Sequence, residues 1–280
     1  MKKIPKSVKK IFKPVYNAAK IAIYKTCDYY DGLKGRKNPI VPPRHMIFIG
    51  DGDYIKIGEE FLTYFKELGQ LKPAHKVLDV GCGIGRMSVP LTKYLSEEGE
   101  YFGFDIVKKG IEWCKKNISV RYPNFHYDHA NIYNKMYNPE GTEKSSEYRF
   151  SFENKTFDFV FLTSVFTHMM TADITRYVSE ISRVMKKGGK CLITFFLLNR
   201  SSRELIKNGA SSQNLIHRFE EYSFIKDNDL PESAIGFDEE FIRRLFSVSS
   251  LRVIEPIHYG SWCGRKTYRS YQDIVIAEKL

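Results

Sequence analysis

The sequence predicts an α/β fold, a doubly wound and mostly parallel seven-stranded sheet with an antiparallel C-terminal strand pair. Short apolar runs alternate with helical segments between residues 56 and 200, and this alternation is typical of a parallel sheet with helices on both faces. A glycine-rich turn directly follows the first apolar run. Two further runs, at residues 251–257 and 272–277, supply the antiparallel pair. With 280 residues and 42% hydrophobic content, the chain can bury a full core.

Residues 1–44 carry nearly all of the net charge of +11. They hold ten Lys and two Arg against Asp28 and Asp31, a balance of 12 − 2 = +10, whereas the rest of the chain holds 32 basic and 31 acidic residues. Apolar residues recur there at helical spacing, at Val8, Ile11, Phe12, Val15, Ala19, Ala22 and Ile23. We expect a basic amphipathic helix, bent or restarted at Pro14. Its alternative roles are packing on its own domain, lying through residues 1–25 on an anionic membrane surface, and contact with nucleic acid.

A proline-rich stretch, Asn38–Arg44, predicts an extended hinge. It separates the segment 1–44 from a domain over residues 45–280. Two turn-rich stretches, at about 133–156 and 198–236, interrupt the alternation and are interpreted as insertions. Ligands of open α/β sheets bind beyond the carboxyl ends of the strands, where both insertions emerge. The second is the better candidate for a substrate cap, although its aromatic residues are also typical of a local mini-core.

The glycine-rich turn follows the strand Val77–Val80 and has the pattern of a nucleotide cradle. Its glycines let the backbone turn tightly and approach a ligand; they are Gly81, Gly83 and Gly85. A dinucleotide fingerprint places its third glycine where this chain has Arg86, so the spacing disfavours NAD. Asp79 would repel a pyrophosphate but suits an ammonium or sulfonium group. These features favour S-adenosylmethionine.

The next two strands end in polar residues that complete the cofactor site. Asp105, at the end of the run 101–105, is placed to chelate two ribose hydroxyls. After the run that starts at Phe125, Asn131 is placed to hydrogen-bond the adenine amino group and Ile132 to cover the ring. Buried strands are then predicted at residues 157–163 and 188–196.

Together these motifs resemble those of the class I S-adenosylmethionine-dependent methyltransferases, whose first motif reads VLDVGCGxGR. The resemblance covers residues 56–200 and implies a Rossmann-like fold with S-adenosylmethionine as cofactor. It implies that Asp79 holds the methionine end, Asp105 the ribose and Asn131 the adenine, a position where Asp is usual. It also implies that residues 45–54 fold over the cofactor as a lid. The expected cofactor-binding residues are Asp79, Gly81, Cys82, Gly83, Gly85, Arg86, Asp105, Ile106, Asn131, Ile132 and Thr163.

The acceptor and the catalytic residues are less constrained by sequence. Methyl transfer needs positioning and desolvation, and an alcohol acceptor also needs a base. His168, which follows the fourth strand, is the first candidate base, with packing against the cofactor as its alternative role; His258, in the terminal loop, is the second. That loop, at residues 258–268, is either an acceptor-binding loop or a long hairpin whose Trp262 caps the core.

We expect O-methylation of a small-molecule or saccharide acceptor. The alternatives are a lipid or lipid-linked acceptor at a membrane surface, and binding of S-adenosylmethionine without catalysis. Nucleic acid is disfavoured because the domain is nearly neutral and has Thr163-Ser-Val-Phe166 where amino-methylating enzymes have [DNS]PP[FYW]. Five scattered cysteines without a CxxC pair predict buried thiols, no metal site and a cytoplasmic, or peripheral membrane, location.

Overall fold

A seven-stranded sheet forms the centre of the computed structural model, which describes residues 6–36, 38–50 and 52–280, with side chains in the first helix from residue 18 onward. Its strand order is β10-β11-β5-β4-β1-β2-β3. Strands β1 to β5 run parallel, and β11 is antiparallel to its neighbours β5 and β10. The predicted sheet and its antiparallel pair are confirmed. The strands are β1 (Lys76–Val80), β2 (Glu100–Asp105), β3 (Phe125–His129), β4 (Phe157–Leu162), β5 (Met185–Phe195), β10 (Leu251–His258) and β11 (Asp273–Lys279).

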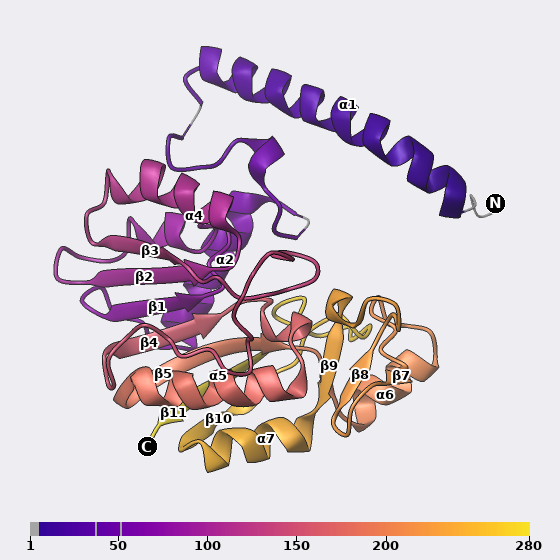
Figure 1. Ribbon diagram of the computed structural model, residues 1–280. Coiled ribbons are helices and arrows are strands. Elements are labelled where there is room, and N and C mark those ends of the chain that lie inside the picture. Colours follow the sequence, from indigo (N-terminus) through magenta and orange to yellow (C-terminus); the bar gives the residue numbers. More distant parts are fainter. Residues whose placement is uncertain (1–5, 37, 51) are drawn as a thin grey trace.

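Helices cover both faces of this sheet, and each face has its own apolar cluster (Figure 1). Strand β1 is buried on both sides: Leu78 and Val80 pack with α5 and α7, whereas Val77 packs with α2 and α4. Asp53 and Asp238 cap the first turns of α2 and α7 by accepting backbone N–H groups. The helices are α2 (Tyr54–Glu67), α3 (Ser88–Leu91), α4 (Lys108–Cys114), which continues into the π-helix η2 (Lys115–Ser119), α5 (Thr171–Val184) and α7 (Glu239–Val248).

The stretch predicted as the second insertion folds into a small sheet of its own. Strand β6 (Leu197–Leu198) leaves the carboxyl end of β5 and starts the order β6-β9-β8-β7. Figure 1 places this sheet beyond the carboxyl edge of the main one. Of the aromatic residues in this stretch, Phe219 is exposed, whereas Phe224 is half-buried against a local apolar cluster that includes Leu198, Leu215 and Trp262, so the stretch does contain a mini-core. The remaining elements are α6 (Arg200–Lys207), β7 (His217–Arg218), β8 (Ser223–Ile225), η4 (Pro231–Ser233) and β9 (Ile235–Asp238).

The N-terminal helix α1 (Lys6–Leu33) is one element of 28 residues. Of the two expectations for Pro14, a restart is wrong, because the helix continues past it, whereas the bend stays a prediction. Figure 1 shows α1 as a rod beside the α/β body. No helix among the described residues is long and apolar enough to cross a bilayer.

The proline-rich stretch is attached to the domain. Ile40 is 3% exposed and packs in the cluster on the α2 face, because an apolar side chain loses free energy by leaving water. The 3₁₀-helix η1 (Arg44–Met46) follows, and Arg44 pairs with Asp28 and Asp31 of α1. The extended hinge expected over residues 38–44 is therefore corrected to a packed segment.

Candidate active site

Asp79 is a buried carboxylate near the carboxyl end of β1, between β2 and β4. It is 1% exposed, and Tyr101 donates a hydrogen bond to its Oδ2 at 2.7 Å. Its Oδ1 has no partner among the described residues. Burial, with a smaller contribution from the nearby Asp105, raises the pKa of Asp79 to about 8, although the hydrogen bond from Tyr101 opposes this shift. An unpartnered buried oxygen is costly, so this position is suited to a cationic ligand.

The glycine-rich turn connects β1 to the end of β2. The amides of Gly81 and Cys82 both donate to the Phe104 carbonyl, at 2.9 and 3.1 Å. The amide of Gly83 donates to the Asp105 carboxylate at 2.8 Å. All three glycines have positive φ, at +82°, +58° and +82° for Gly81, Gly83 and Gly85, a conformation that side-chain-bearing residues rarely adopt. The Cys82 side chain is buried against Gly103 and faces the core.

Asp105 lies at the carboxyl end of β2, as predicted. Besides the Gly83 amide, its carboxylate accepts from the Val107 amide at 2.7 Å. Burial raises the pKa of Asp105 above its ordinary value. Ile106 is half-buried against the α5 face, and its carbonyl is 3.1 Å from Nε2 of His129. The structure thus places Asp79, the turn and Asp105 next to one another.

Asn131 and Ile132 follow β3 and begin the first insertion. Asn131 is exposed, and its Nδ2 donates to Oγ1 of Thr142 at 2.9 Å. Ile132 is 1% exposed and packs in the core of the α5 face. The ring-covering role expected of Ile132 is therefore corrected, since its side chain faces the core, while the role of Asn131 stays a prediction.

A short segment covers the turn from the N-terminal side. A Cβ on Gly83 would lie 2.8 Å from Cγ2 of Ile49, and one on Gly110 would lie 3.1 Å from the Phe48 ring. The Arg86 guanidinium donates to the Ile49 carbonyl, and its Nε has no partner among the described residues. We name residues 47–50 the cover segment. Arg86, expected to bind the cofactor, instead holds the cover segment.

His168 lies where the chain leaves β4. Thr163 ends the strand half-buried, and the 3₁₀-helix η3 (Phe166–His168) follows. Nδ1 of His168 lies 2.6 Å from the Glu232 carbonyl oxygen. A carbonyl oxygen can only accept, so Nδ1 carries the proton and Nε2 is an acceptor. Burial lowers the pKa of His168, which favours this neutral form.

Both insertions meet around His168. Glu232 belongs to η4 in the second insertion, and the ring of Tyr137 from the first lies edge-on to the imidazole, with centroids 6.0 Å apart. Lys135 Nζ also reaches the Asp229 carbonyl at 3.5 Å and links the two insertions. The arrangement surrounds one neutral histidine at the carboxyl edge of the sheet.

Comparisons with known proteins agree with this geometry. The family described as "Methyltransferase domain" matches residues 78–193. The PH0226 protein from Pyrococcus horikoshii superposes with a TM-score of 0.56 at 19% identity, over 84% of this chain and 95% of that one. A SAM-dependent methyltransferase from Methanosarcina mazei gives 0.51 at 22% identity, over 75% of this chain and 94% of that one. Residues 78–193 therefore form a methyltransferase domain, within a chain that has the fold of these two solved structures.

Curated relatives of this methyltransferase chain act on different atoms. It is 27% identical to Phosphoethanolamine N-methyltransferase 2 of Caenorhabditis elegans, over 53% of this chain and 29% of that one. It is 30% identical to a ubiquinone/menaquinone biosynthesis C-methyltransferase of Wigglesworthia glossinidia brevipalpis, over 50% of this chain and 49% of that one. It is 28% identical to a Ubiquinone biosynthesis O-methyltransferase of Pelagibacter ubique, over 55% and 54%. The chain spans about half or less of the length of these relatives.

The residues around the glycine-rich turn of the methyltransferase domain fit S-adenosylmethionine as a cofactor. Asp79 Oδ1 is buried and has no partner in the described part of the chain, so it is free to face a cationic group. The turn supplies three glycines with positive φ, and Asp105 stands at the end of the adjacent strand. These features support the predicted roles of Asp79, the glycines and Asp105.

The structure does not bring His258 to this site. His258 ends β10, which is separated from β4 by β11 and β5. Three strand spacings amount to about 14 Å, which a single imidazole does not bridge. We therefore withdraw His258 as a base for methyl transfer in this domain.

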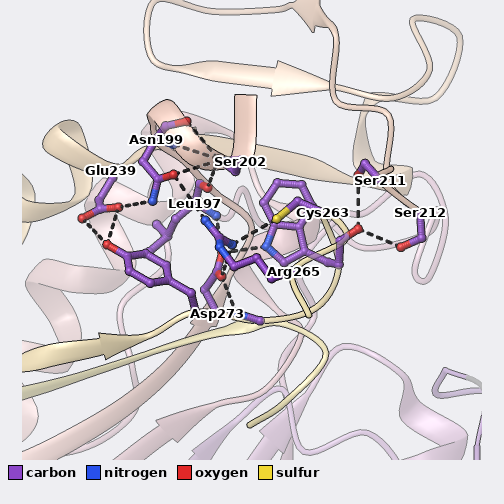
Figure 2. A network of polar contacts seen from close by, with 12 residues as sticks. Leu197, Asn199, Ser202, Ser211, Ser212, Glu239, Cys263, Arg265 and Asp273 are labelled. Atoms are coloured by element: carbon purple, nitrogen blue, oxygen red, sulfur yellow. Dashed lines mark hydrogen bonds and ion pairs between the residues drawn. The ribbon is translucent and has the colours of Figure 1, made fainter. Parts of the chain in front are cut away.

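Figure 2 shows Cys263 and Arg265 of the terminal loop in a polar network with Asp273 and residues of the second insertion. The carboxylate of Asp273, which is fully buried, accepts from the amides of Leu197 and Gly260 and from Nε1 of Trp262, each at 2.7 Å. Arg265 lies 3.4 Å from the same carboxylate. Burial raises the pKa of Asp273 to about 6. Trp262 is fully buried, so its core-capping role is correct.

Sequence reasoning missed two contributors to the site. The Glu232 carbonyl is 64 residues from His168 and is a backbone atom, so no side-chain pattern marks it. Val165 covers the turn, because a Cβ on Gly81 would lie 2.4 Å from its Cγ2. Its only signal is its place directly after the fourth strand.

Proposed function

We propose that this protein transfers the methyl group of S-adenosylmethionine to a hydroxyl oxygen of a small-molecule or saccharide acceptor. The observation that carries the proposal is the protonation pattern of His168. The Glu232 carbonyl holds its Nδ1–H, burial lowers its pKa, and Nε2 is left as an acceptor. The named relatives methylate nitrogen, carbon or oxygen, so the choice of oxygen rests on this histidine.

The cofactor is held by residues around the glycine-rich turn. Asp79 faces its cationic end, the turn lets its backbone approach, and Asp105 accepts from the ribose hydroxyls. Bound there, the cofactor supplies an electrophilic methyl group. The cover segment and Val165 lie over Gly83 and Gly81, so they exclude water from the reacting atoms.

His168 Nε2 accepts the proton of the acceptor hydroxyl as that oxygen becomes a nucleophile. A neutral hydroxyl is a weak nucleophile, whereas an amine with a free lone pair needs no base. A buried neutral imidazole is therefore most useful to an oxygen acceptor. Tyr137 and the Glu232 backbone form the walls on either side, which supports an acceptor small enough to enter between the two insertions.

A lipid or lipid-linked acceptor is the second candidate. It is favoured by α1, where Ile23, Tyr29 and Leu33 are 61%, 69% and 69% exposed on a helix beside the body. A helix of this kind would carry the domain to an acceptor that stays in a membrane.

Label transfer distinguishes these functions. Purified protein is incubated with methyl-labelled S-adenosylmethionine and a cell extract, which is then separated into saccharide, small-molecule, lipid, protein and nucleic-acid fractions. We expect label in the saccharide or small-molecule fraction, and its loss with His168→Gln. Label in the lipid fraction would select the second candidate. Bound cofactor without label in any fraction would contradict both and indicate a binding protein.

A further inference from the structure

One side of α1 is mostly apolar over the described residues 18–33, with Thr26 as the polar residue at its centre. At 100° per residue, six described positions fall within an arc of about 120°; they are Ala19, Ala22, Ile23, Tyr29, Tyr30 and Leu33. The four larger side chains are between 54% and 69% exposed. In the sequence, the apolar positions from Val8 to Val15 continue the same spacing. None of these four larger side chains is covered by another residue that the structure describes.

A salt-bridge clamp fixes which way this face points. Asp28 and Asp31 lie on the opposite side of α1, and Arg44 of the domain bonds both carboxylates at 2.6 Å. The Arg44 amide also donates to Asp28 at 3.0 Å. Because the polar side is held against the domain at this point, the apolar side is turned away from it.

Lysines accompany the apolar face. Residues 1–25 contain eight Lys and no Asp or Glu. Lys34 lies over the Tyr30 ring at 4.4 Å, so its apolar stem runs along the exposed face while its charge stays in water. An apolar stripe flanked by lysines is the composition of helices that lie in the plane of an anionic membrane surface.

We infer that α1 docks on an anionic lipid surface through its apolar face, which extends to Leu33 and includes Tyr29 and Tyr30, and that the Arg44 clamp sets how the domain sits on that surface. A second copy of the chain fits this face less well, because pairing it would bring two lysine-rich helices together. Nucleic acid would leave the apolar face in water. The inference does not depend on the acceptor or on methyl transfer.

The test measures partitioning of the full chain onto vesicles by flotation. Phosphatidylcholine vesicles are compared with vesicles that also contain phosphatidylserine, at low and high salt. We expect binding only with phosphatidylserine, weakened by salt. The variant Ile23→Gln with Leu33→Gln should lower the partition coefficient about tenfold or more, since both side chains lose burial in the interface.

A matched control carries the same kind of change elsewhere. Val120→Gln with Val248→Gln alters two side chains that are 73% and 81% exposed on the body, and it should partition like the unaltered protein. Unchanged thermal unfolding midpoints of both variants exclude misfolding. The inference is overturned if the chain ignores phosphatidylserine or if the α1 variant still binds. It is also overturned if sedimentation shows that the unaltered protein is a dimer and the α1 variant a monomer.

Discussion

Asp79 and His168 are buried groups whose protonation states are set by their surroundings. Burial raises the pKa of Asp79 to about 8, so its carboxyl group is mostly protonated below that pH when no cofactor is bound. His168 has the opposite shift, because burial lowers its pKa and keeps it neutral. Asp79 is placed to bind the cationic cofactor, and His168 is placed to accept a proton from the acceptor. Methyl transfer to a hydroxyl requires both.

Cofactor affinity should depend on the ionisation of Asp79. With a pKa of about 8, only about a tenth of the carboxylate is ionised at pH 7, so binding of the cationic cofactor should weaken about tenfold per pH unit below pH 8. Isothermal titration calorimetry from pH 6.5 to 9 measures this. Asp79→Asn should bind about tenfold more weakly at pH 9 and lose the pH dependence, whereas Asp128→Asn on the exposed part of β3 should change neither. A flat profile for the unaltered protein would contradict the role of Asp79.

Removal of the base should slow chemistry without weakening cofactor binding. His168→Gln should lower kcat by about 100-fold or more and leave the cofactor Kd within about twofold. At saturating cofactor, the kcat of the unaltered protein should persist as pH falls until the pH reaches the lowered pKa of His168, and the variant should lose that limb of the pH profile. His126→Gln, in the amino-terminal half of β3, is the control. Equal turnover of His168→Gln would assign the histidine to packing.

Among the helices and strands, the sequence predicts features that are set by neighbouring residues and misses contacts between residues far apart in the chain. Strands β1, β2 and β4 agree with their predicted ranges within a residue, because each is a largely buried and apolar run between turns. Asp79, the glycines and Asp105 are likewise predictable, since their roles follow from positions at strand ends. The Glu232–His168 contact joins residues far apart in the chain, and the small sheet depends on β6 continuing from β5. The Glu232–His168 contact and the small sheet both depend on tertiary contacts, which no local sequence pattern specifies.

The cover segment should be sensitive to the glycine beneath it. Gly83→Ala meets Cγ2 of Ile49 at 2.8 Å and also strains a φ of +58°. Gly209→Ala has a similar φ of +72° but open space around it, so it isolates the backbone cost of about 1–2 kcal/mol. Calorimetric titration should show a larger loss of cofactor affinity for Gly83→Ala, of about tenfold or more, and little change for Gly209→Ala. Similar affinities for the two variants would indicate that the cover segment does not contact the cofactor.

For the whole molecule, buried polar contacts join the terminal hairpin to the second insertion. Asp273 begins β11 and accepts from Leu197 in β6, from Trp262 and from Gly260. Arg265 reaches both Asp273 and Asn199, just before α6. These contacts connect the second insertion, which borders His168, to the β10–β11 edge of the main sheet.

Loss of this carboxylate should therefore destabilise the whole domain. Asp273→Ala leaves Arg265 and several buried N–H groups without their acceptor, so the free energy of unfolding should fall by about 3–5 kcal/mol. Urea denaturation followed by circular dichroism measures the change. Asp227→Ala, on an exposed loop, should stay within about 0.5 kcal/mol of the unaltered protein. A loss below about 1 kcal/mol for Asp273→Ala would show that these contacts add little to stability.

The most direct test of the account identifies the bond that the protein makes. S-adenosylmethionine labelled with ¹³C in its methyl group is incubated with the protein and the acceptor-containing fraction, and the product is examined by nuclear magnetic resonance. We expect a methyl carbon with the chemical shift of an O-methyl group, formed by the unaltered protein and nearly absent with His168→Gln. A methyl carbon bonded to nitrogen or carbon, or an O-methyl product formed equally well without His168, would contradict it.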